Sequence, residues 1–380
     1  MRLLPLFALL LSCSEKPVQT PPPPSGWRPA SVEAESQGEG DNFWWRLTSA
    51  GNRLLAMTGM GDIWVSESYS AGFRKMEWKW PGRPYTIATE GDYAWVGTEE
   101  PGRVYKCRIT NWACVDLKLP DPDSMHVGYV GKFKDNIVVS SDAYKVRSIW
   151  WLNQGTWKDW SQGFPIDGTI YRTLEIGDTL WAATWSNGLW YRVASEASWK
   201  RQPSPRRTWV LGPDSATAPR GIAWHSGALW VAYQSKDIIR MPNAKPPYQT
   251  SSNCLSKDGL YGDCKNPPVN IYSILSYRDR LFVGGYYGAA PYVLDERTGF
   301  WITTEIAGWC WNDNAQCGGK RTWDLVGLGD TLYSASSRYI MKIPLAEVPG
   351  FQPSMMAQFH WSSDTSWRDS VLRRNNPIGW

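Results

Sequence analysis

Residues 177–193 read GDTLWAATWSNGLWYRV: a Gly-Asp-Thr turn, an apolar strand, a short polar bend and a second apolar strand. The unit recurs along the chain, and its first apolar residue after the turn marks each copy: Leu54, Ala94, Ile137, Leu180, Leu229, Leu281 and Leu332. The first three intervals between markers are 40 to 43 residues long, and the last three are 49 to 52. Repeats of this length that hold four short strands are typical of β-propeller blades. We therefore predict an all-β fold, a seven-bladed β-propeller with four antiparallel strands per blade.

Each repeat supplies four strands in order. Strand a precedes the turn, as at residues 171–176, and the quoted hairpin supplies strands b and c. Strand d is expected at an aromatic segment, which is marked by Trp78, Trp80, Trp112, Trp157, Trp160, Trp199, Tyr248, Phe300 and Trp301. Trp95, Trp181 and Trp230 occupy one repeated strand position, which favours packing between blades over stacking on a sugar.

Two of the repeats resemble a known family. Residues 180–184 (LWAAT) with Gly188 and Leu189, and residues 94–98 (AWVGT), are similar to repeats of propellers of the two-component-regulator type. The resemblance covers about residues 43–345, although the units at Lys134 and Arg278 depart from it. It implies the propeller fold and, as an expectation, a role in ligand sensing.

The N-terminus predicts export and a lipid anchor. Arg2 is followed by an apolar run too short for a transmembrane helix, which is typical of a signal peptide. Residues 10–13 (LLSC) resemble the bacterial lipobox, so we expect removal of residues 1–12 and acylation of Cys13, for example by palmitate; a plain signal peptide is the alternative. Ser14, rather than Asp, after the cysteine favours the outer membrane of the cell envelope. Its periplasmic or surface face is not specified.

The expected domain organisation follows from these features. Residues 1–12 are the lipoprotein signal peptide, and residues 13–41 are the lipidated cysteine and a tether that contains the stiff run PVQTPPPPS. Residues 42–363 form the propeller, and residues 364–380 form a C-terminal tail.

Six further cysteines form three local pairs: Cys107 with Cys114, Cys254 with Cys264, and Cys310 with Cys317. An oxidising compartment explains them as disulfides. Zinc is the alternative, but the chain has only three histidines and no CxxC motif. We therefore expect disulfides and no metal site.

Composition and motifs exclude several functions. The net charge is +4 without a run of Lys or Arg, which argues against a nucleic-acid partner. The chain has no GxSxG or HExxH motif, and we assign no catalytic residue and no cofactor. An acid–base pair of carboxylates stays open, because spacing across blades cannot be read from the sequence.

Three long connections between a strand d and the next strand a suggest a binding surface. They span residues 203–219, 252–270 and 307–321, and they must leave the propeller on one face. Four aromatic residues in these loops are candidate contacts with a partner: Trp209, Tyr261, Trp309 and Trp311. The alternative is that the loops are surface decoration.

A second candidate site lines the central channel. The positions eight residues before the markers are Arg46, Thr86, Tyr129, Arg172, Gly221, Ser273 and Asp324, and one position earlier lie Trp45, Tyr85, Gly128, Tyr171, Arg220, Tyr272 and Trp323. From these rings we select Arg46, Tyr129, Arg172, Arg220, Trp323 and Asp324 as candidates to bind a polar or anionic ligand. The alternative is a structural charge network that fills the channel.

Closure of the ring requires a fourth strand for the last blade. We expect residues 358–363 to provide it, because they contain the aromatic pattern of the other d strands. Residues 27–35 compete for this place but are polar. Packing of blade seven on blade one, with Trp44 and Trp45 at the seam, would then close the propeller.

Three functions remain open. The favoured one is a non-enzymatic binding or scaffold lipoprotein that presents a face with disulfide-stapled loops to a protein or glycan. The others are an envelope enzyme acting on glycans through carboxylates at the channel mouth, and an assembly factor for outer-membrane proteins.

Overall fold

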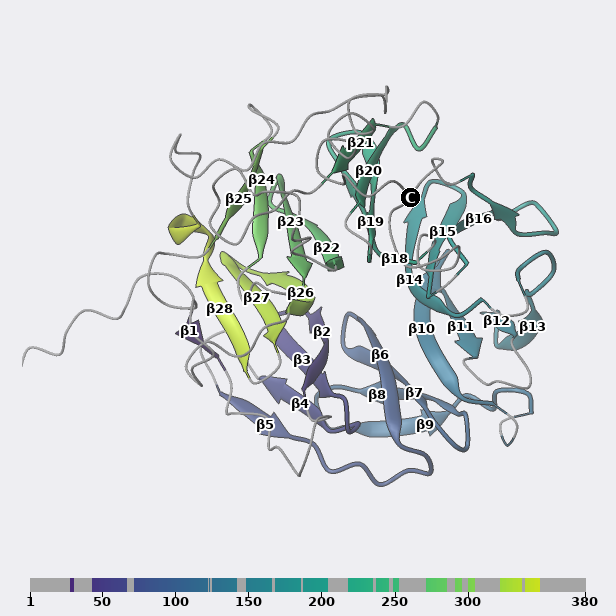
Figure 1. Ribbon diagram of the computed structural model, residues 1–380. Coiled ribbons are helices and arrows are strands. Elements are labelled where there is room, and N and C mark those ends of the chain that lie inside the picture. Colours follow the sequence, from purple (N-terminus) through teal and green to yellow (C-terminus); the bar gives the residue numbers. More distant parts are fainter. Residues whose placement is uncertain are drawn as a thin grey trace, which may run out of the picture.

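The computed structural model describes residues 28–30, 43–66, 72–121, 123, 125–141, 148–165, 168–185, 187–203, 218–234, 237–245, 249–252, 271–285, 291–295, 300–304, 322–336 and 339–348. These residues form seven sheets of four antiparallel strands each and no α-helix. The sheets stand around a central axis like the blades of a propeller (Figure 1). The predicted fold is confirmed.

The first four blades, each from its inner strand outward, are as follows. Blade 1 has β2 (Trp44–Ala50), β3 (Arg53–Thr58), β4 (Ile63–Ser66) and β5 (Phe73–Lys75); blade 2 has β6 (Pro84–Glu90), β7 (Tyr93–Thr98), β8 (Val104–Arg108) and β9 (Ala113–Asp116). Blade 3 has β10 (Val127–Phe133), β11 (Asn136–Ser141), β12 (Ile149–Asn153) and β13 (Thr156–Asp159); blade 4 has β14 (Ile170–Ile176), β15 (Thr179–Thr184), β16 (Leu189–Val193) and β17 (Lys200–Arg201).

The last three blades follow the same order. Blade 5 has β18 (Pro219–His225), β19 (Ala228–Tyr233), β20 (Asp237–Pro242) and β21 (Gln249–Ser252); blade 6 has β22 (Ile271–Tyr277), β23 (Arg280–Gly285), β24 (Tyr292–Asp295) and β25 (Phe300–Thr303). Blade 7 has β26 (Thr322–Leu328), β27 (Thr331–Ser336), β28 (Ile340–Pro344) and, outermost, β1 (Arg28–Pro29); η4 (Leu345–Glu347), one turn of 3₁₀ helix, follows β28.

The second strand of each blade is buried on both faces, because a blade lies between two neighbours. The seven sequence markers each take the second position of this strand, and all are buried. Strands buried on both sides read as continuous apolar runs, which explains why the repeats were visible in the sequence. Trp95, Trp181 and Trp230 are buried at the expected packing positions.

The expected closure of the ring is wrong. The fourth strand of blade 7 is β1, which pairs with β28 through Arg28 opposite Lys342 and Pro29 opposite Met341. The backbone N–H of Ala30 extends the pairing by donating to the Ile340 carbonyl at 2.7 Å. Residues 358–363, which were expected there, lie outside the described residues.

The physical reason for this error is that an outermost strand needs few apolar side chains. It pairs through its backbone on one edge only, and such an edge tolerates proline. The N-terminal strand therefore joins the last blade, and hydrogen bonds as well as packing close the ring (Figure 1). The seam still carries the expected packing, since Trp44 lies in one cluster with Tyr333 and Ile340.

Two smaller expectations can be compared directly. Cys107 and Cys114 face each other across β8 and β9 and form the expected disulfide. The other two cysteine pairs, and Cys13, lie outside the described residues. Of the aromatic residues assigned to the outer strands, Trp157, Phe300 and Trp301 lie in β13 and β25 as expected, whereas Trp78, Trp112 and Trp199 flank β5, β9 and β17.

No helix long and apolar enough to cross a bilayer occurs within the part of the chain that the structure describes.

Candidate functional site

The two ends of the channel differ in which connections they carry. Each inner strand begins opposite the end of the second strand, as Trp44 does opposite Thr58. The connections from second to third strand and from one blade to the next therefore share one end, which we call the mouth end. The other end carries the tight turns between inner and second strands, and we call it the turn end. The connections at residues 203–219, 252–270 and 307–321 start and finish at the mouth end, although their residues lie largely outside the described part.

All seven inner strands have a β-bulge at the mouth end. The pairing of inner and second strands skips one residue in every blade: Trp45, Tyr85, Gly128, Tyr171, Arg220, Tyr272 and Trp323. A bulge re-aims side chains and increases the local twist. The two rings predicted from the sequence are thus the bulge residue and its successor.

Arg172 and Asp324 form an ion pair across the channel. The guanidinium of Arg172 in blade 4 lies 2.5 Å from Oδ1 of Asp324 in blade 7. These blades are not neighbours, so the contact must cross the axis. Asp324 also accepts the backbone N–H of Leu47, in blade 1, at 3.0 Å. Burial opposes the charge on Arg172, but the attraction of Asp324 outweighs it and raises the pKa of Arg172.

Arg46 lies in the same cluster without a carboxylate of its own. Its guanidinium carbon is 4.9 Å from the centroid of the Trp45 ring and 4.6 Å from that of Tyr171, on the far side of the channel. Burial lowers the pKa of Arg46, and the charge of Arg172 lowers it further. Contacts with ring faces stabilise a desolvated cation by roughly 2 kcal/mol.

Arg220 is the third buried cation at the mouth end. It lies 3.3 Å from the centroid of the Trp185 ring and 5.2 Å from that of Tyr171, and its Nε donates to Gln234 Oε1 at 2.9 Å. Burial lowers the pKa of Arg220 to about 10. The side chain is therefore still positively charged at neutral pH.

Aromatic rings surround these charges. Trp323 stacks on Phe43 at 4.7 Å between centroids, and it lies 4.7 Å from Tyr272 and 5.5 Å from Trp45. Trp45 in turn meets Tyr171 edge to face at 6.2 Å. We call these rings the aromatic collar: Phe43, Trp45, Tyr171, Trp185, Tyr272 and Trp323. Trp185 is 48% exposed, so the collar reaches the surface.

Several donors in this cluster lack an acceptor. Among the described residues, no hydrogen-bond partner meets Nε or Nη1 of Arg46, Nη1 of Arg220, or Nε1 of Trp45, and all four atoms are buried. A buried donor left without a partner costs about 1–3 kcal/mol, and more when it carries charge. The described part of the mouth therefore holds surplus positive charge and surplus donors.

A carboxylate and a histidine lie at the same end between blades 2 and 3. Glu99 accepts hydrogen bonds from Arg83 and, at 2.8 Å, pairs with Nε2 of His126, whose ring packs 4.9 Å from that of Tyr85. Burial alone would raise the pKa of Glu99, but the hydrogen bonds from His126 and Arg83 outweigh it and lower that pKa. The negative charge of this carboxylate is therefore already compensated by its neighbours.

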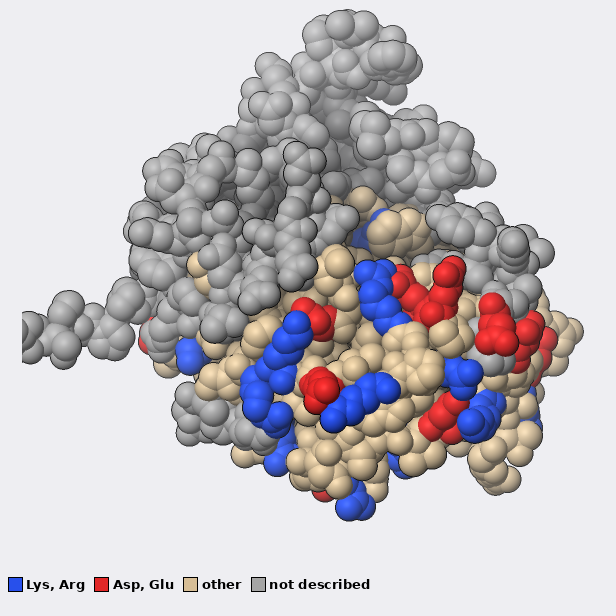
Figure 2. Space-filling model, turned by 90° about the horizontal axis from the view of Figure 1, so that it is seen from below, with Lys and Arg blue, Asp and Glu red and all other residues tan. Residues whose placement is uncertain are grey.

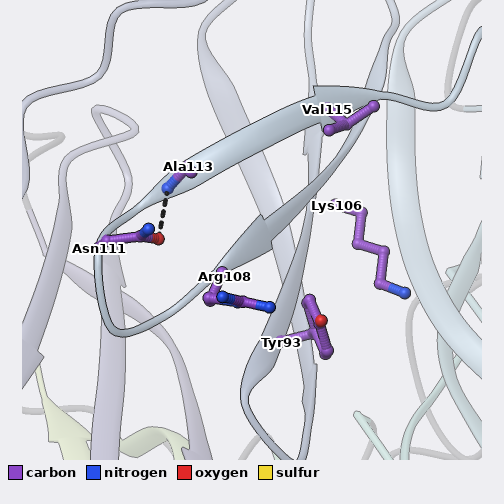
Figure 3. A pocket seen from close by; sticks show the side chains of 6 residues that line it. All are labelled: Tyr93, Lys106, Arg108, Asn111, Ala113 and Val115. Atoms are coloured by element: carbon purple, nitrogen blue, oxygen red, sulfur yellow. Dashed lines mark hydrogen bonds between the residues drawn. The ribbon is translucent and has the colours of Figure 1, made fainter.

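A separate open hollow of about 260 Å³ lies on the outer part of blade 2. Its lining comprises Tyr93, Lys106, Arg108, Asn111, Ala113 and Val115 (Figure 3). The ammonium of Lys106 lies 4.3 Å from the Tyr93 ring centroid, and Val115 is 67% exposed. The outer surface seen in Figure 2 interleaves basic and acidic groups rather than concentrating one charge. The mouth, whose cations are buried, is the stronger candidate.

The structure brings together five of the six channel candidates. Arg46, Arg172, Arg220, Trp323 and Asp324 belong to one cluster, whereas the hydroxyl of Tyr129 lies 2.7 Å from Oγ1 of Thr173. The four loop candidates, Trp209, Tyr261, Trp309 and Trp311, lie outside the described residues.

Sequence reasoning missed Trp185, Gln234 and Glu99. All three stand five positions after a marker, where the second strand ends at the mouth. This repeated position is a signal in the sequence for residues at the mouth, but the predicted rings include only inner-strand positions.

No group of three His, Cys, Asp or Glu side chains that could hold a metal ion occurs among the residues the structure describes.

Comparison with known proteins gives likenesses of fold. No protein-family model matches the chain, and no curated protein matches it. The extracellular domain of the hybrid two-component system BT4673 from B. thetaiotaomicron is similar, with 12% identity, a TM-score of 0.61, and coverage of 84% of this chain and 39% of that one. This chain therefore spans well under half the length of that structure.

YCF48 is similar along nearly its whole length. The structure of YCF48 bound to D1 peptide has 8% identity, a TM-score of 0.59, and coverage of 84% of this chain and 97% of that one. YCF48 from Cyanidioschyzon merolae has 10% identity, a TM-score of 0.57, and coverage of 85% and 100%. At these identities the likeness shows the fold alone. The fold-level resemblance to two-component-system propellers is confirmed.

Proposed function

We propose that this protein is a lipid-anchored, extracytoplasmic binding or scaffold protein that presents the mouth end of its propeller to a protein or glycan partner. The observation that carries the proposal is the collar of buried arginines and aromatic rings at the mouth end, from which Trp185 reaches the surface. Arginine and tryptophan are the side chains most enriched where binding energy concentrates.

The carboxylates at the mouth favour a binder over a glycan-active enzyme. Asp324 is held by Arg172 and by the N–H of Leu47, and Glu99 is held by Arg83 and His126. A general acid needs a carboxyl with a raised pKa, whereas the pKa of Glu99 is lowered.

The known relatives in fold fit this role. A propeller of this shape forms part of the extracellular domain of BT4673, and another, YCF48, has been seen with a peptide bound. The long loops at residues 203–219, 252–270 and 307–321 would extend the same face. Their aromatic residues, Trp209, Tyr261, Trp309 and Trp311, would add contacts, and disulfides at Cys254–Cys264 and Cys310–Cys317 would hold two of the loops in shape.

The anchor places the propeller at a membrane of the cell envelope, which we propose is the outer membrane. Acylated Cys13 would hold it there, with the Pro-rich run before β1 as a spacer. Substitution Cys13→Ser should move the protein from the membrane fraction to a soluble or unprocessed form. Unchanged processing and membrane association in that variant would rule out the anchor.

The binding face is tested by a matched pair of tryptophans. Trp185 lies at the mouth end, and Trp224, near the turn end of β18, is 37% exposed. Trp185→Ala should abolish capture of the partner from detergent-solubilised envelopes, and Trp224→Ala should leave it intact. Equal loss, or loss with Trp224→Ala alone, would refute the assignment of the mouth as the binding end.

A further inference from the structure

Among the described residues, the mouth holds more buried positive charge than its carboxylates neutralise. Arg46 and Arg220 are buried and Arg172 is partly buried, whereas Asp324 is the one carboxylate that any of them contacts among the described residues. Asp324 is committed to Arg172 at 2.5 Å. The charges of Arg46 and Arg220 are left without a counter-ion in that part of the chain.

These two cations share one neighbourhood. Both guanidinium carbons lie within 5.2 Å of the centroid of the Tyr171 ring, and the Trp45 ring lies 6.2 Å from the same centroid. The two charges repel each other: burial lowers the pKa of Arg220, and the nearby charge of Arg46 lowers it further. Uncompensated charges inside a protein are costly unless an opposite charge joins them.

A buried arginine that contacts a ring face still needs hydrogen-bond acceptors, as Arg192 shows. Arg192 in blade 4 lies 4.4 Å from the Trp160 ring centroid, yet its Nε donates to the Glu196 carbonyl at 3.2 Å and its Nη1 to the Trp160 carbonyl at 2.8 Å. Arg46 and Arg220 have the same kind of ring contact, but Nε and Nη1 of Arg46 and Nη1 of Arg220 have no acceptor among the described residues.

We propose that Arg46, Arg220 and the indole N–H of Trp45 form a binding site for an oxyanion, a carboxylate or phosphate group, at the mouth of the channel. Guanidinium donors match the oxygens of these groups, and an indole N–H adds a neutral donor. The ion pair of Arg172 with Asp324 lies beside the site. The proposal deepens the proposed function and rests on it only for the mouth as the binding end.

The oxyanion could be a free small ion or a group on the macromolecular partner. The test uses the full-length protein in detergent, with inorganic phosphate and acetate as probes at constant ionic strength in chloride. Bound anion stabilises the folded state, so each probe should raise the melting temperature by a few degrees. Arg220→Gln should abolish this rise, and the matched control Arg192→Gln should keep it.

Calorimetry gives a second readout that does not depend on the stability of the variants. Arg46→Lys retains the positive charge but loses the Nε and Nη1 donors. It should weaken phosphate binding by about tenfold. No rise in melting temperature with either probe, or equal loss in the Arg192→Gln and Arg220→Gln variants, would overturn the site, as would unchanged affinity in Arg46→Lys.

Competition separates the two sources of the anion. If phosphate displaces the captured partner, the oxyanion belongs to the partner; if phosphate binds while the partner stays bound, the site holds a free ion. Either result supports the site. Loss of capture in Trp185→Ala without any binding of phosphate or acetate would leave the proposed function standing and overturn this inference.

Discussion

The two ends of the inner strands are built on opposite principles. At the turn end, neighbouring blades are joined by satisfied contacts: Thr48 Oγ1 lies 2.5 Å from Thr89 Oγ1, and Lys134 Nζ lies 2.6 Å from Asp178 Oδ1. At the mouth end, each strand is bulged, and buried cations keep donors that have no acceptor within the described part of the chain.

This difference places satisfied contacts and buried charge at opposite ends of the same repeat. Proteins tolerate irregular pairing and unsatisfied polar groups where binding requires them, and they compensate elsewhere. The turn end carries satisfied contacts between blades, and the mouth end carries buried charge. Substitutions at the two ends should therefore fail in different ways.

The largest loss of stability is expected from breaking the ion pair of Arg172 with Asp324 at the mouth. Asp324→Asn leaves the partly buried charge of Arg172 without a partner and should destabilise the fold by about 3 kcal/mol. Denaturant unfolding measures the loss. Combining Asp324→Asn with Arg172→Gln should recover much of it, because both charges are then gone. A fully additive double variant would show that the pair is not coupled.

Removal of the closing strand should come next. Deletion of residues 28–30 removes the pairing of β1 with β28 and exposes the edge of β28. We expect a loss of about 3 kcal/mol from the missing backbone hydrogen bonds, together with aggregation through the open edge. Thermal unfolding and light scattering check both effects. A control that ends the chain after residue 350 keeps β1 and should stay monomeric and stable. If the chain that ends after residue 350 is instead the less stable of the two, the C-terminal segment closes the ring.

A contact at the turn end should cost less and leave binding untouched. Thr89→Val removes the hydroxyl that lies against Thr48 and donates to the Ser49 carbonyl at 2.7 Å. The expected loss is about 1 kcal/mol. Partner capture should be unchanged, measured beside Trp185→Ala. A loss of capture as large as that of Trp185→Ala would erase the functional difference between the two ends.

The smallest effect should depend on pH. The lowered pKa of Glu99 means that its contribution is present above the pKa of an unfolded glutamate, about 4.3, and is lost as pH falls through the lower folded value. Since the group is partly exposed, the contribution is at most about 1 kcal/mol. In urea melts, Glu99→Gln should be less stable than the parent at pH 7, and the gap should narrow as the pH falls below about 4.3. A gap that stays constant over this range would remove the ionised carboxylate as its cause.

The repeated hairpin made most of the fold predictable. Strands buried on both faces carry unbroken apolar runs, so the markers found β3, β7 and the corresponding strands of the other blades. The inner strand expected at residues 171–176 coincides with β14, which begins one residue earlier. The same alignment placed Arg46, Arg172 and Asp324 on one ring before any contact was known.

The closing strand and the collar were harder to predict for different reasons. The two residues of β1 pair through the backbone, so their side chains carry no apolar signal. Trp185 and Gln234 lie in connections between strands, and each meets Arg220 only because the ring brings blades 4 and 5 together. A contact between repeats leaves no local pattern in the sequence.

The most direct test of the binding end places a photo-crosslinking amino acid at position 185 or at position 224 of the full-length protein in intact cells. These positions lie toward the mouth end and the turn end. We predict a discrete crosslinked product from position 185 and none from position 224. A product from position 224 with none from position 185 would contradict the assignment of the mouth as the binding end.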